Sequence, residues 1–293
     1  MDLSDFAEAV GAEDPVRIEG TASRGGAPGT ERCVQAPCGV VEFLPAEMTV
    51  RCGAGTLLDE LQDVLRESGQ TVRIGSGGTV GGALSLGRAG VCRLGHGPVR
   101  DALLQARYVN ANGRVVKAGG PTVKNVSGFD LCRLLVGARG TLGFLGEVIL
   151  RTRPLPPVSR WFTAEVADPF AVLQVLYRPS AVLWDGRSVW VCLEGHHADV
   201  EEQSRLVPGV VEVGAPPTLP SGSRRSLAPR ALRHLEGEFV AELGVGVVHH
   251  SEPSPGPEVD PRVKALHAQL KRAFDPTGRM NPGVDLMAGV GAA

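Results

Sequence analysis

The sequence predicts an α+β protein of two unequal domains, and three observations carry this prediction. Glycine supplies 39 of the 293 residues, about twice the usual ~7%, so many turns must run close to another surface. Residues 124–153 pass from a polar turn through a short helix into an alternating strand, with glycines where elements meet. Beyond the proline-rich residues 154–157, the hydrophobic pattern changes to a β-α-β-β-α-β order.

The composition excludes several classes of protein. Lysine and arginine total 30 against 32 aspartate and glutamate residues, which leaves no basic field for nucleic acid or an anionic membrane. The six cysteines lack the spacing of a zinc or iron–sulfur site, so we predict no metal and interpret them as buried, reduced thiols. A small ligand or a protein partner is the better expectation.

The amino-terminal segment and the hydropathy pattern indicate a cytoplasmic protein. Residues 1–6 are acidic and lack the basic and then apolar layout of a signal peptide. No apolar run is long enough to span a bilayer. Any membrane association would therefore come through a partner.

The first domain is expected to cover residues 1–155. Its amphipathic helix at 56–68 has Thr56 as the predicted N-cap and Gly69 as the C-cap, and Asn112-Gly113 predicts a type I′ hairpin turn. The other expected elements are a helix at 4–10, strands at 15–19, 40–44 and 49–52, a hairpin of 104–110 and 114–118, a helix at 131–136 behind the capping residue Asp130, and a strand at 144–150.

The second domain is expected at residues 156–260, followed by a segment at 261–293 that packs back on the first domain. Strands at 161–166, 181–184, 188–193 and 210–213, with helices after Asp168 and at 198–206, make a ferredoxin-like unit. Residues 215–228 are predicted as a loop, 229–239 as a helix and 245–248 as a strand ending at His249 and His250. The last helix, 261–274, is predicted to bury Val263, Leu266, Leu270 and Phe274.

Three glycine-rich segments have the chemistry of a phosphate cradle. Residues 20–26 follow a strand, residues 75–82 contain five glycines and two hydroxyl residues, and residues 140–143 form a tight turn. Such segments present backbone N–H groups without side-chain bulk, which suits a pyrophosphate. Taken alone, each is also compatible with a plain turn inside a core.

The order of motifs resembles a known family. The chain reads V-R-D at 99–101, then a hairpin, then K-N-V-S-G-F-D at 124–130 and L-x-x-G-x-x-G-T-L-G ending at Gly143. Near the carboxyl end, residues 274–283 read F-D-P-T-G-R-M-N-P-G. Together they resemble the FAD-binding domain of the vanillyl-alcohol oxidase and p-cresol methylhydroxylase (PCMH) superfamily. Within it, they are most similar to the FAD-binding subunit of bacterial glycolate oxidase.

The resemblance implies a two-subdomain PCMH-type domain with non-covalent FAD, because His96 does not match the context of a flavin-linked histidine. Phe129 replaces a tyrosine that is common in the family. The cofactor-binding residues that it implies are Gly20, Thr21, Ala22, Ser23, Arg24, Gly78, Thr79, Gly81, Gly82, Ser85, Gly90, Arg100, Lys124, Gly140, Thr141, Gly143 and Asn281.

The resemblance also implies oxidation of a small 2-hydroxy acid, glycolate or D-lactate, by hydride transfer to the flavin. His249 or His250 is the candidate base, and Arg230 or Arg233 the candidate ligand of the carboxylate. The implied partners are a larger homologous FAD subunit and an iron–sulfur subunit. The second domain is shorter than the usual cap domain of the family, so a flavin-containing relay or assembly subunit without its own substrate site is the alternative. A Rossmann dehydrogenase is disfavoured, since no G-x-G-x-x-G follows the first strand.

Overall fold

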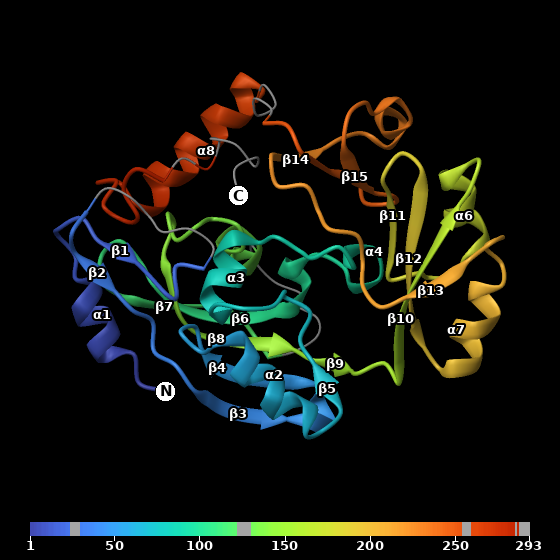
Figure 1. The fold of residues 1–293 in the computed structure, drawn as a ribbon. Coiled ribbons are helices and arrows are strands. Elements are labelled where there is room, and N and C mark those ends of the chain that lie inside the picture. Colours follow the sequence, from blue (N-terminus) through green and yellow to red (C-terminus); the bar gives the residue numbers. More distant parts are fainter. Residues whose placement is uncertain (24–29, 122–129, 254–258, 285, 287–293) are drawn as a thin grey trace. The chain divides into compact units, whose positions relative to one another are not determined.

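The computed structural model describes residues 1–23, 30–121, 130–253, 259–284 and 286 (Figure 1). The chain divides into two compact units. Unit 1 comprises Met1–Ala89, Pro98–Leu155 and Val259–Leu286, and unit 2 comprises Gly90–Gly97, Pro156–Glu258 and Met287–Ala293. The residues Arg24, Lys124 and Phe129, which carry part of the sequence-based prediction, lie outside the described residues.

Unit 1 is built on an antiparallel sheet of five strands in the order β3-β4-β8-β6-β7. Its central strand, β8 (Phe144–Arg151), is buried along nearly its whole length because it has a neighbour on each side. The other strands are β3 (Val40–Leu44), β4 (Thr49–Gly53), β6 (Leu103–Val109) and β7 (Val115–Gly119).

Helices pack against this sheet and complete the main core of unit 1. Helix α2 (Leu58–Arg66) inserts Leu58, Leu61 and Leu65, which lie on one side of the helix, into that core. Helices α3 (Val80–Leu86) and α5 (Leu131–Leu135) contribute to the same cluster (Figure 1). The pair β5 (Gln70–Thr71) and β9 (Arg153–Pro154), with the 3-10 turns Pro45–Glu47 and Val99–Ala102, connects these elements.

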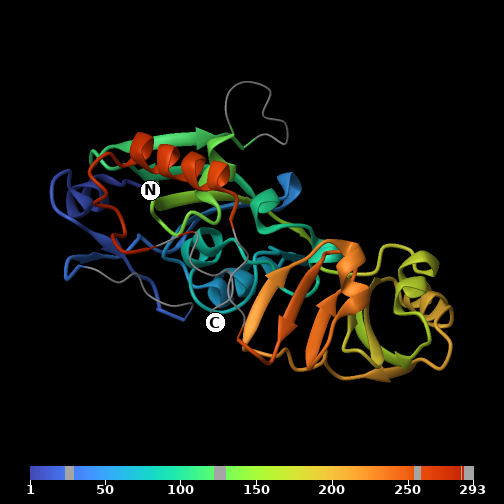
Figure 2. The same ribbon diagram turned by 90° about the horizontal axis from the view of Figure 1, so that it is seen from above.

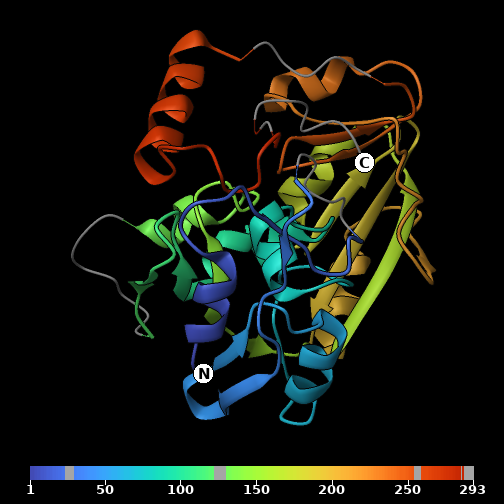
Figure 3. The same cartoon turned by 90° about the vertical axis from the view of Figure 1, so that its left-hand side faces the viewer.

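A second, smaller core joins the two ends of the chain in unit 1. Helix α1 (Ser4–Val10) contacts β2 (Cys33–Val34) and β6, as Figure 3 shows, and β2 runs parallel to β1 (Arg17–Ile18). Met280 follows helix α8 (Pro261–Phe274) and pairs with Val16, so the carboxy-terminal segment lies beside β1. Phe6, Val10 and Met280 are buried together.

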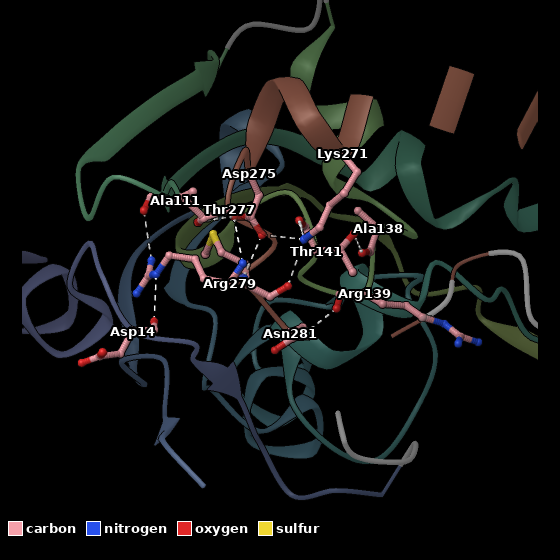
Figure 4. A network of polar contacts seen from close by, with 11 residues as sticks. Asp14, Ala111, Ala138, Arg139, Thr141, Lys271, Asp275, Thr277, Arg279 and Asn281 are labelled. Atoms are coloured by element: carbon pink, nitrogen blue, oxygen red, sulfur yellow. Dashed lines mark hydrogen bonds and ion pairs between the residues drawn. The ribbon is translucent and has the colours of Figure 1, made fainter. Parts of the chain in front are cut away.

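Buried charges hold this carboxy-terminal segment in place (Figure 4). The guanidinium of Arg279 donates to the carbonyls of Asp14, Ala111 and Val10 at 2.9, 3.0 and 2.6 Å. Asp275 accepts from the backbone N–H groups of Arg279 and Met280, and its carboxylate lies 2.6 Å from Lys271 Nζ. Burial lowers the pKa of Arg279, the charge of Arg32 adds to this shift, and Asp275 opposes it. The segment is thus fixed by charge-assisted hydrogen bonds as well as by apolar packing.

Unit 2 is a sheet of seven strands in the order β13-β10-β12-β11-β15-β16-β14. Its first four positions have the ferredoxin-like arrangement that the sequence predicts. Those strands are β10 (Val158–Glu165), β11 (Ala181–Trp184), β12 (Ser188–Gly195) and β13 (Val211–Val213). The extension consists of β14 (Ser223–Ser226), β15 (Phe239–Glu242) and β16 (Val247–His250).

The two faces of this sheet are covered differently. Helices α6 (Pro169–Val175) and α7 (His197–Ser204) cover one face (Figures 1 and 2). On the other face, Val91 and Cys92 pack against Ala181, Cys192 and neighbouring side chains, and α4 (Arg93–His96) follows directly. The segment 90–97 therefore belongs to unit 2 although the residues on both sides of it belong to unit 1.

Several predictions for unit 1 are wrong in detail. Thr56 does not cap α2, because its hydroxyl donates to the carbonyl of Gly53 and Leu57 is the N-cap. The hairpin turn is not type I′, since only Gly113 has a positive φ. Of the side chains predicted to face the core from helix α8, Phe274 packs half-buried against it, whereas Val263 and Leu266 are 41% and 54% exposed. Cys33 and Cys38 are exposed rather than buried.

Two predictions for unit 2 are wrong for one reason. Residues 223–226, predicted as loop, form β14, and residues 229–239 form a six-residue 3-10 helix, Pro229–His234, followed by β15. Polar and small residues can form these strands because they pair with β16 and extend an existing sheet. His249 and His250 consequently lie within a strand and not beyond its end.

We predict that Arg279→Met destabilises unit 1. Loss of the guanidinium leaves three buried carbonyls without their donors, which costs about 3 kcal/mol. Urea unfolding followed by circular dichroism measures this change, while the tryptophans, all at 161, 184 and 190 in unit 2, report on unit 2 separately.

Arg272→Met, at an exposed position of α8, is the matched control and should leave both transitions unchanged. Equal unfolding midpoints for Arg279→Met and the wild type would contradict this role of Arg279.

Candidate functional site

The first part of the site lies where the end of β1 meets the start of α3. A Cβ on Gly20 would lie 2.9 Å from Thr79 Oγ1, so these two segments touch. Thr79 caps α3 by accepting the N–H of Gly82 at 3.1 Å. Among the described residues this hydroxyl makes no further hydrogen bond, so its hydrogen can be donated to a ligand.

The carboxyl end of α3 fixes the second part of the site. The carbonyl of Leu84 accepts the N–H of Gly137 at 3.0 Å, and the carbonyl of Ser85 accepts the N–H of Arg139 at 2.9 Å. These carbonyls belong to the last turn of the helix, where no intrahelical donor remains. The turn at 137–140 is thus held directly against α3.

Asn281 joins the remaining segments (Figure 4). Its Oδ1 accepts the N–H of Ile18 at 2.9 Å, and its Nδ2 donates to the carbonyl of Arg139 at 2.6 Å. A Cβ on Gly140 would lie 2.5 Å from Nδ2, so only glycine fits there. Unit 1 therefore brings together Gly20, Thr79 at the start of α3, the turn at Gly140 and the carboxy-terminal segment.

Backbone strain gathers in the same place. Among the described residues, five non-glycine residues have a positive φ, and three of them are Ala22 at 53°, Arg139 at 49° and Asn281 at 45°. Such conformations persist where the surrounding structure enforces them, and they are frequent at ligand sites. Sequence reasoning missed Arg139, because only its position before Gly140 in a glycine-rich turn could have indicated it.

The glycines of the site have two different roles. A Cβ on Gly81 would lie 2.9 Å from the carbonyl of Ala54, and one on Gly143 would lie 2.5 Å from the ring of Tyr108, so chain packing requires both. Gly77 and Gly90, in contrast, have open space where a side chain would lie. Gly90 belongs to unit 2.

The other predicted contacts differ in their accessibility. Thr141 is 2% exposed and donates its hydroxyl to Ala138 at 2.7 Å, so it shapes the turn. Thr21 and Ser23 are exposed and hydrogen-bonded to each other at 3.0 Å. Arg100 is exposed, with Nε 3.9 Å from Asp101 Oδ1, a distance at which an exposed pair contributes little stability.

In unit 2, the two candidate catalytic histidines point to opposite faces of the sheet, as consecutive residues of a strand do. His249 Nε2 lies 2.9 Å from Oε1 of Glu242, a carboxylate that is only 2% exposed. Oε2 of Glu242 is buried and has no hydrogen-bond partner among the described residues.

His250 has an apolar setting. Its ring lies 6.0 Å from that of Phe239, between centroids. Burial lowers the pKa of His250, the charge of Arg225 adds to the shift, and Glu252 opposes it. The two histidines therefore do not form a joint site.

The two arginines that the sequence offered as carboxylate ligands are placed elsewhere. Arg233 lies 4.0 Å above the ring of Phe170 and 3.6 Å from Asp168, where it supports α6. Arg230 is exposed.

The described residues contain no group of three or more histidine, cysteine or acidic side chains arranged to hold a metal ion. Within the same residues, no helix has the length and apolar character that a bilayer crossing requires.

Comparisons with known proteins agree with this geometry. Residues 20–119 match the FAD binding domain family FAD_binding_4. The chain is 27% identical to glycolate oxidase subunit GlcE of Escherichia coli (strain K12), over 96% of this chain and 95% of that protein. It is 35% identical to D-lactate dehydrogenase of Archaeoglobus fulgidus over 54% of this chain and 36% of that protein, and 37% identical to glycolate oxidase subunit GlcD of Bacillus subtilis (strain 168) over 29% and 18%.

A structural comparison gives the same fold. Alkyldihydroxyacetonephosphate synthase superposes with a TM-score of 0.65 at 15% identity, covering 96% of this chain and 72% of that protein. The chain is therefore a flavoprotein with the PCMH-type FAD-binding fold, and FAD is its cofactor. The resemblance to FAD-binding subunits of bacterial glycolate oxidase is confirmed over almost the whole chain.

The residues of unit 1 fit this cofactor. A pyrophosphate needs N–H and O–H donors that it can approach closely. The open surface at Gly77, the positive φ of 67° at Gly78 and the hydroxyl hydrogen of Thr79, which has no acceptor in the part of the chain that the structure describes, meet that need. We propose that these residues, with the exposed start of residues 20–26, bind the pyrophosphate.

We predict that Gly82→Val abolishes retention of FAD. Gly82 is half-buried in the first turn of α3, and a branched side chain there would occupy the space next to Thr79. The measurement is the ratio of flavin absorbance to protein absorbance after gel filtration. Gly214→Val is the control, because a Cβ at Gly214 meets nothing within 4 Å. Full flavin content in Gly82→Val would refute the assignment of the FAD site to the start of α3.

Proposed function

We propose that the chain is an FAD-binding subunit of a glycolate oxidase-like complex, which oxidises a small 2-hydroxy acid to the 2-oxo acid. The observation that carries the proposal is the match to GlcE, which extends over nearly the full length of both chains. The matches to D-lactate dehydrogenase and GlcD cover only part of this chain and still less of those proteins.

The reaction removes a hydride and a proton from the substrate. Bound FAD supplies the hydride acceptor. We assign removal of the hydroxyl proton to His249 and not to His250. With Nε2 of His249 bonded to Glu242, the Nδ1 lone pair is the atom that can accept a proton. The carboxylate of Glu242 then holds the ring in this tautomer and orientation.

Unit 1 provides the cofactor site in this proposal. Residues 1–155 would form the FAD-binding domain, residues 156–260 the cap and residues 261–293 the segment that closes the FAD site. The contacts to FAD from unit 1 are assigned to Gly20, Thr21, Ala22, Ser23, Gly78, Thr79, Gly82, Ser85, Arg100 and Asn281, together with Arg24 and Lys124 outside the described residues. The contact expected of Gly90, which belongs to unit 2, stays a prediction.

The proposed partners are a larger homologous FAD subunit and an iron–sulfur subunit. Reduced flavin needs an onward electron acceptor, and the six cysteines lack the spacing of an iron–sulfur cluster. We place the complex in the cytoplasm, with contact to the membrane only through these partners.

A relay or assembly subunit without its own substrate site is the second candidate. It is favoured by the small size of the cap, whose main segment is Pro156–Glu258. In this case His249 and its carboxylate partner would not take part in the chemistry.

We predict negligible dye reduction by the isolated chain with glycolate or D-lactate, and turnover when both partner subunits are added. In the reconstituted mixture, His249→Ala should lower the rate by about 10²-fold or more, the usual contribution of a general base. His250→Ala is the control and should retain activity, because His250 lies on the other face of the sheet.

Robust turnover by the isolated chain would contradict the dependence on partners. Full activity of His249→Ala in the mixture would instead support the relay subunit.

A further inference from the structure

We propose that Arg224 binds the carboxylate of the substrate beside His249, and that this site accepts a small 2-hydroxy monocarboxylate in preference to a dicarboxylate. The inference rests on the proposed function and names the substrate class for it. All residues that carry it belong to unit 2.

The register of the sheet places Arg224 next to His249. Arg224 on β14 is directly opposite His249 on β16, and cross-strand partners point to the same face. Glu242 on β15 shares that face, because it contacts the ring of His249. Arg225 follows Arg224 in the strand and therefore points to the opposite face, toward His250.

Arg224 is a half-buried cation without a close counter-ion. Among the described residues, no carboxylate lies within ion-pair distance of its guanidinium. Burial lowers the pKa of Arg224; Glu242 counteracts this shift, and the positive charge of Arg93 adds to it. A partly desolvated guanidinium that also feels a second positive charge is stabilised when an anion binds, and a planar carboxylate can accept two parallel hydrogen bonds from it.

The charges that act on Arg224 indicate which anion fits. Arg224 and Arg93 supply two positive charges, and Glu242 supplies one negative charge. The remaining charge of +1 is neutralised by a single carboxylate. With that carboxylate on Arg224, the hydroxyl on the adjacent carbon can reach the neighbouring side chain of His249.

Apart from Arg224, the cross-strand neighbours of His249 and Glu242 are apolar. Val240 pairs with His249, Val247 pairs with Glu242, and both valines are buried. Leu183 pairs with Glu242 from the other side and is also buried. These side chains supply no counter-charge for a second carboxylate, so the site favours a monocarboxylate over a dicarboxylate.

The test is calorimetric binding of glycolate and of D-malate to the FAD-loaded full chain. We expect the wild type to bind glycolate more tightly than D-malate. Arg224→Gln should weaken glycolate binding about tenfold or more, as expected for loss of a hydrogen bond to a charged group. Arg224→Lys keeps the positive charge but cannot form two parallel hydrogen bonds. Its affinity for glycolate should therefore lie between that of the wild type and that of Arg224→Gln.

Arg225→Gln is the matched control, one residue away on the other face, and should bind glycolate as the wild type does. Tryptophan fluorescence verifies that unit 2 is folded in each variant. Unchanged affinity in both Arg224 variants, or absence of glycolate binding by the wild type, would overturn the proposal. Equal affinity for D-malate would overturn the preference for monocarboxylates.

Dye reduction by the reconstituted complex separates this inference from the proposed function. Weaker glycolate binding by Arg224→Gln without any turnover in the wild-type complex would leave the carboxylate site standing and refute the oxidase function. Full turnover of glycolate by a complex that contains Arg224→Gln would support the oxidase function and refute the carboxylate site at Arg224.

Discussion

Unit 1 depends on one constraint: the carboxy-terminal segment that follows α8 is held against β1 by the side chains of Asp275 and Arg279. These two side chains are buried. Arg279 donates to backbone carbonyls far away in the sequence, whereas Asp275 accepts from the backbone N–H groups of Arg279 and Met280 within the segment itself. Because a buried charge without partners is very costly, the segment has few alternative positions. Asn281 is thereby brought to β1 and to the turn at Gly140, and the proposed cofactor site is closed from both ends of the chain.

This arrangement explains why the strained residues are found together. Arg139 and Asn281 hold positive φ angles while their backbone and side-chain groups bond to each other and to α3 and β1. In unit 2, an independent constraint acts on the other candidate residues. The pairing of β14, β15 and β16 places His249 and His250 on opposite faces of the sheet. Arg224 and Glu242 lie on the same face as His249.

Local sequence signals predicted the elements whose stability is local. The helix at 4–10, the strand at 40–44 and the helix at 261–274 are confirmed at their predicted bounds. The sequence predicts only a phosphate loop at residues 75–82, because the glycines there conceal the start of helix α3, which Thr79 caps. Strands β14 and β15 depend on partners distant in the sequence, so their own residues indicated loop and helix. The roles of Arg139, Glu242 and Arg224 come from tertiary contacts that no local pattern encodes.

The most direct test of this account is the FAD dissociation constant of Asn281→Ala, measured by flavin fluorescence. Loss of the hydrogen bonds to Ile18 and Arg139 should release the turn at Gly140 from β1. At about 1.4 kcal/mol for the two bonds, FAD should bind about tenfold more weakly, while tryptophan fluorescence shows unit 2 still folded. An unchanged dissociation constant would contradict the claim that the carboxy-terminal segment closes the cofactor site.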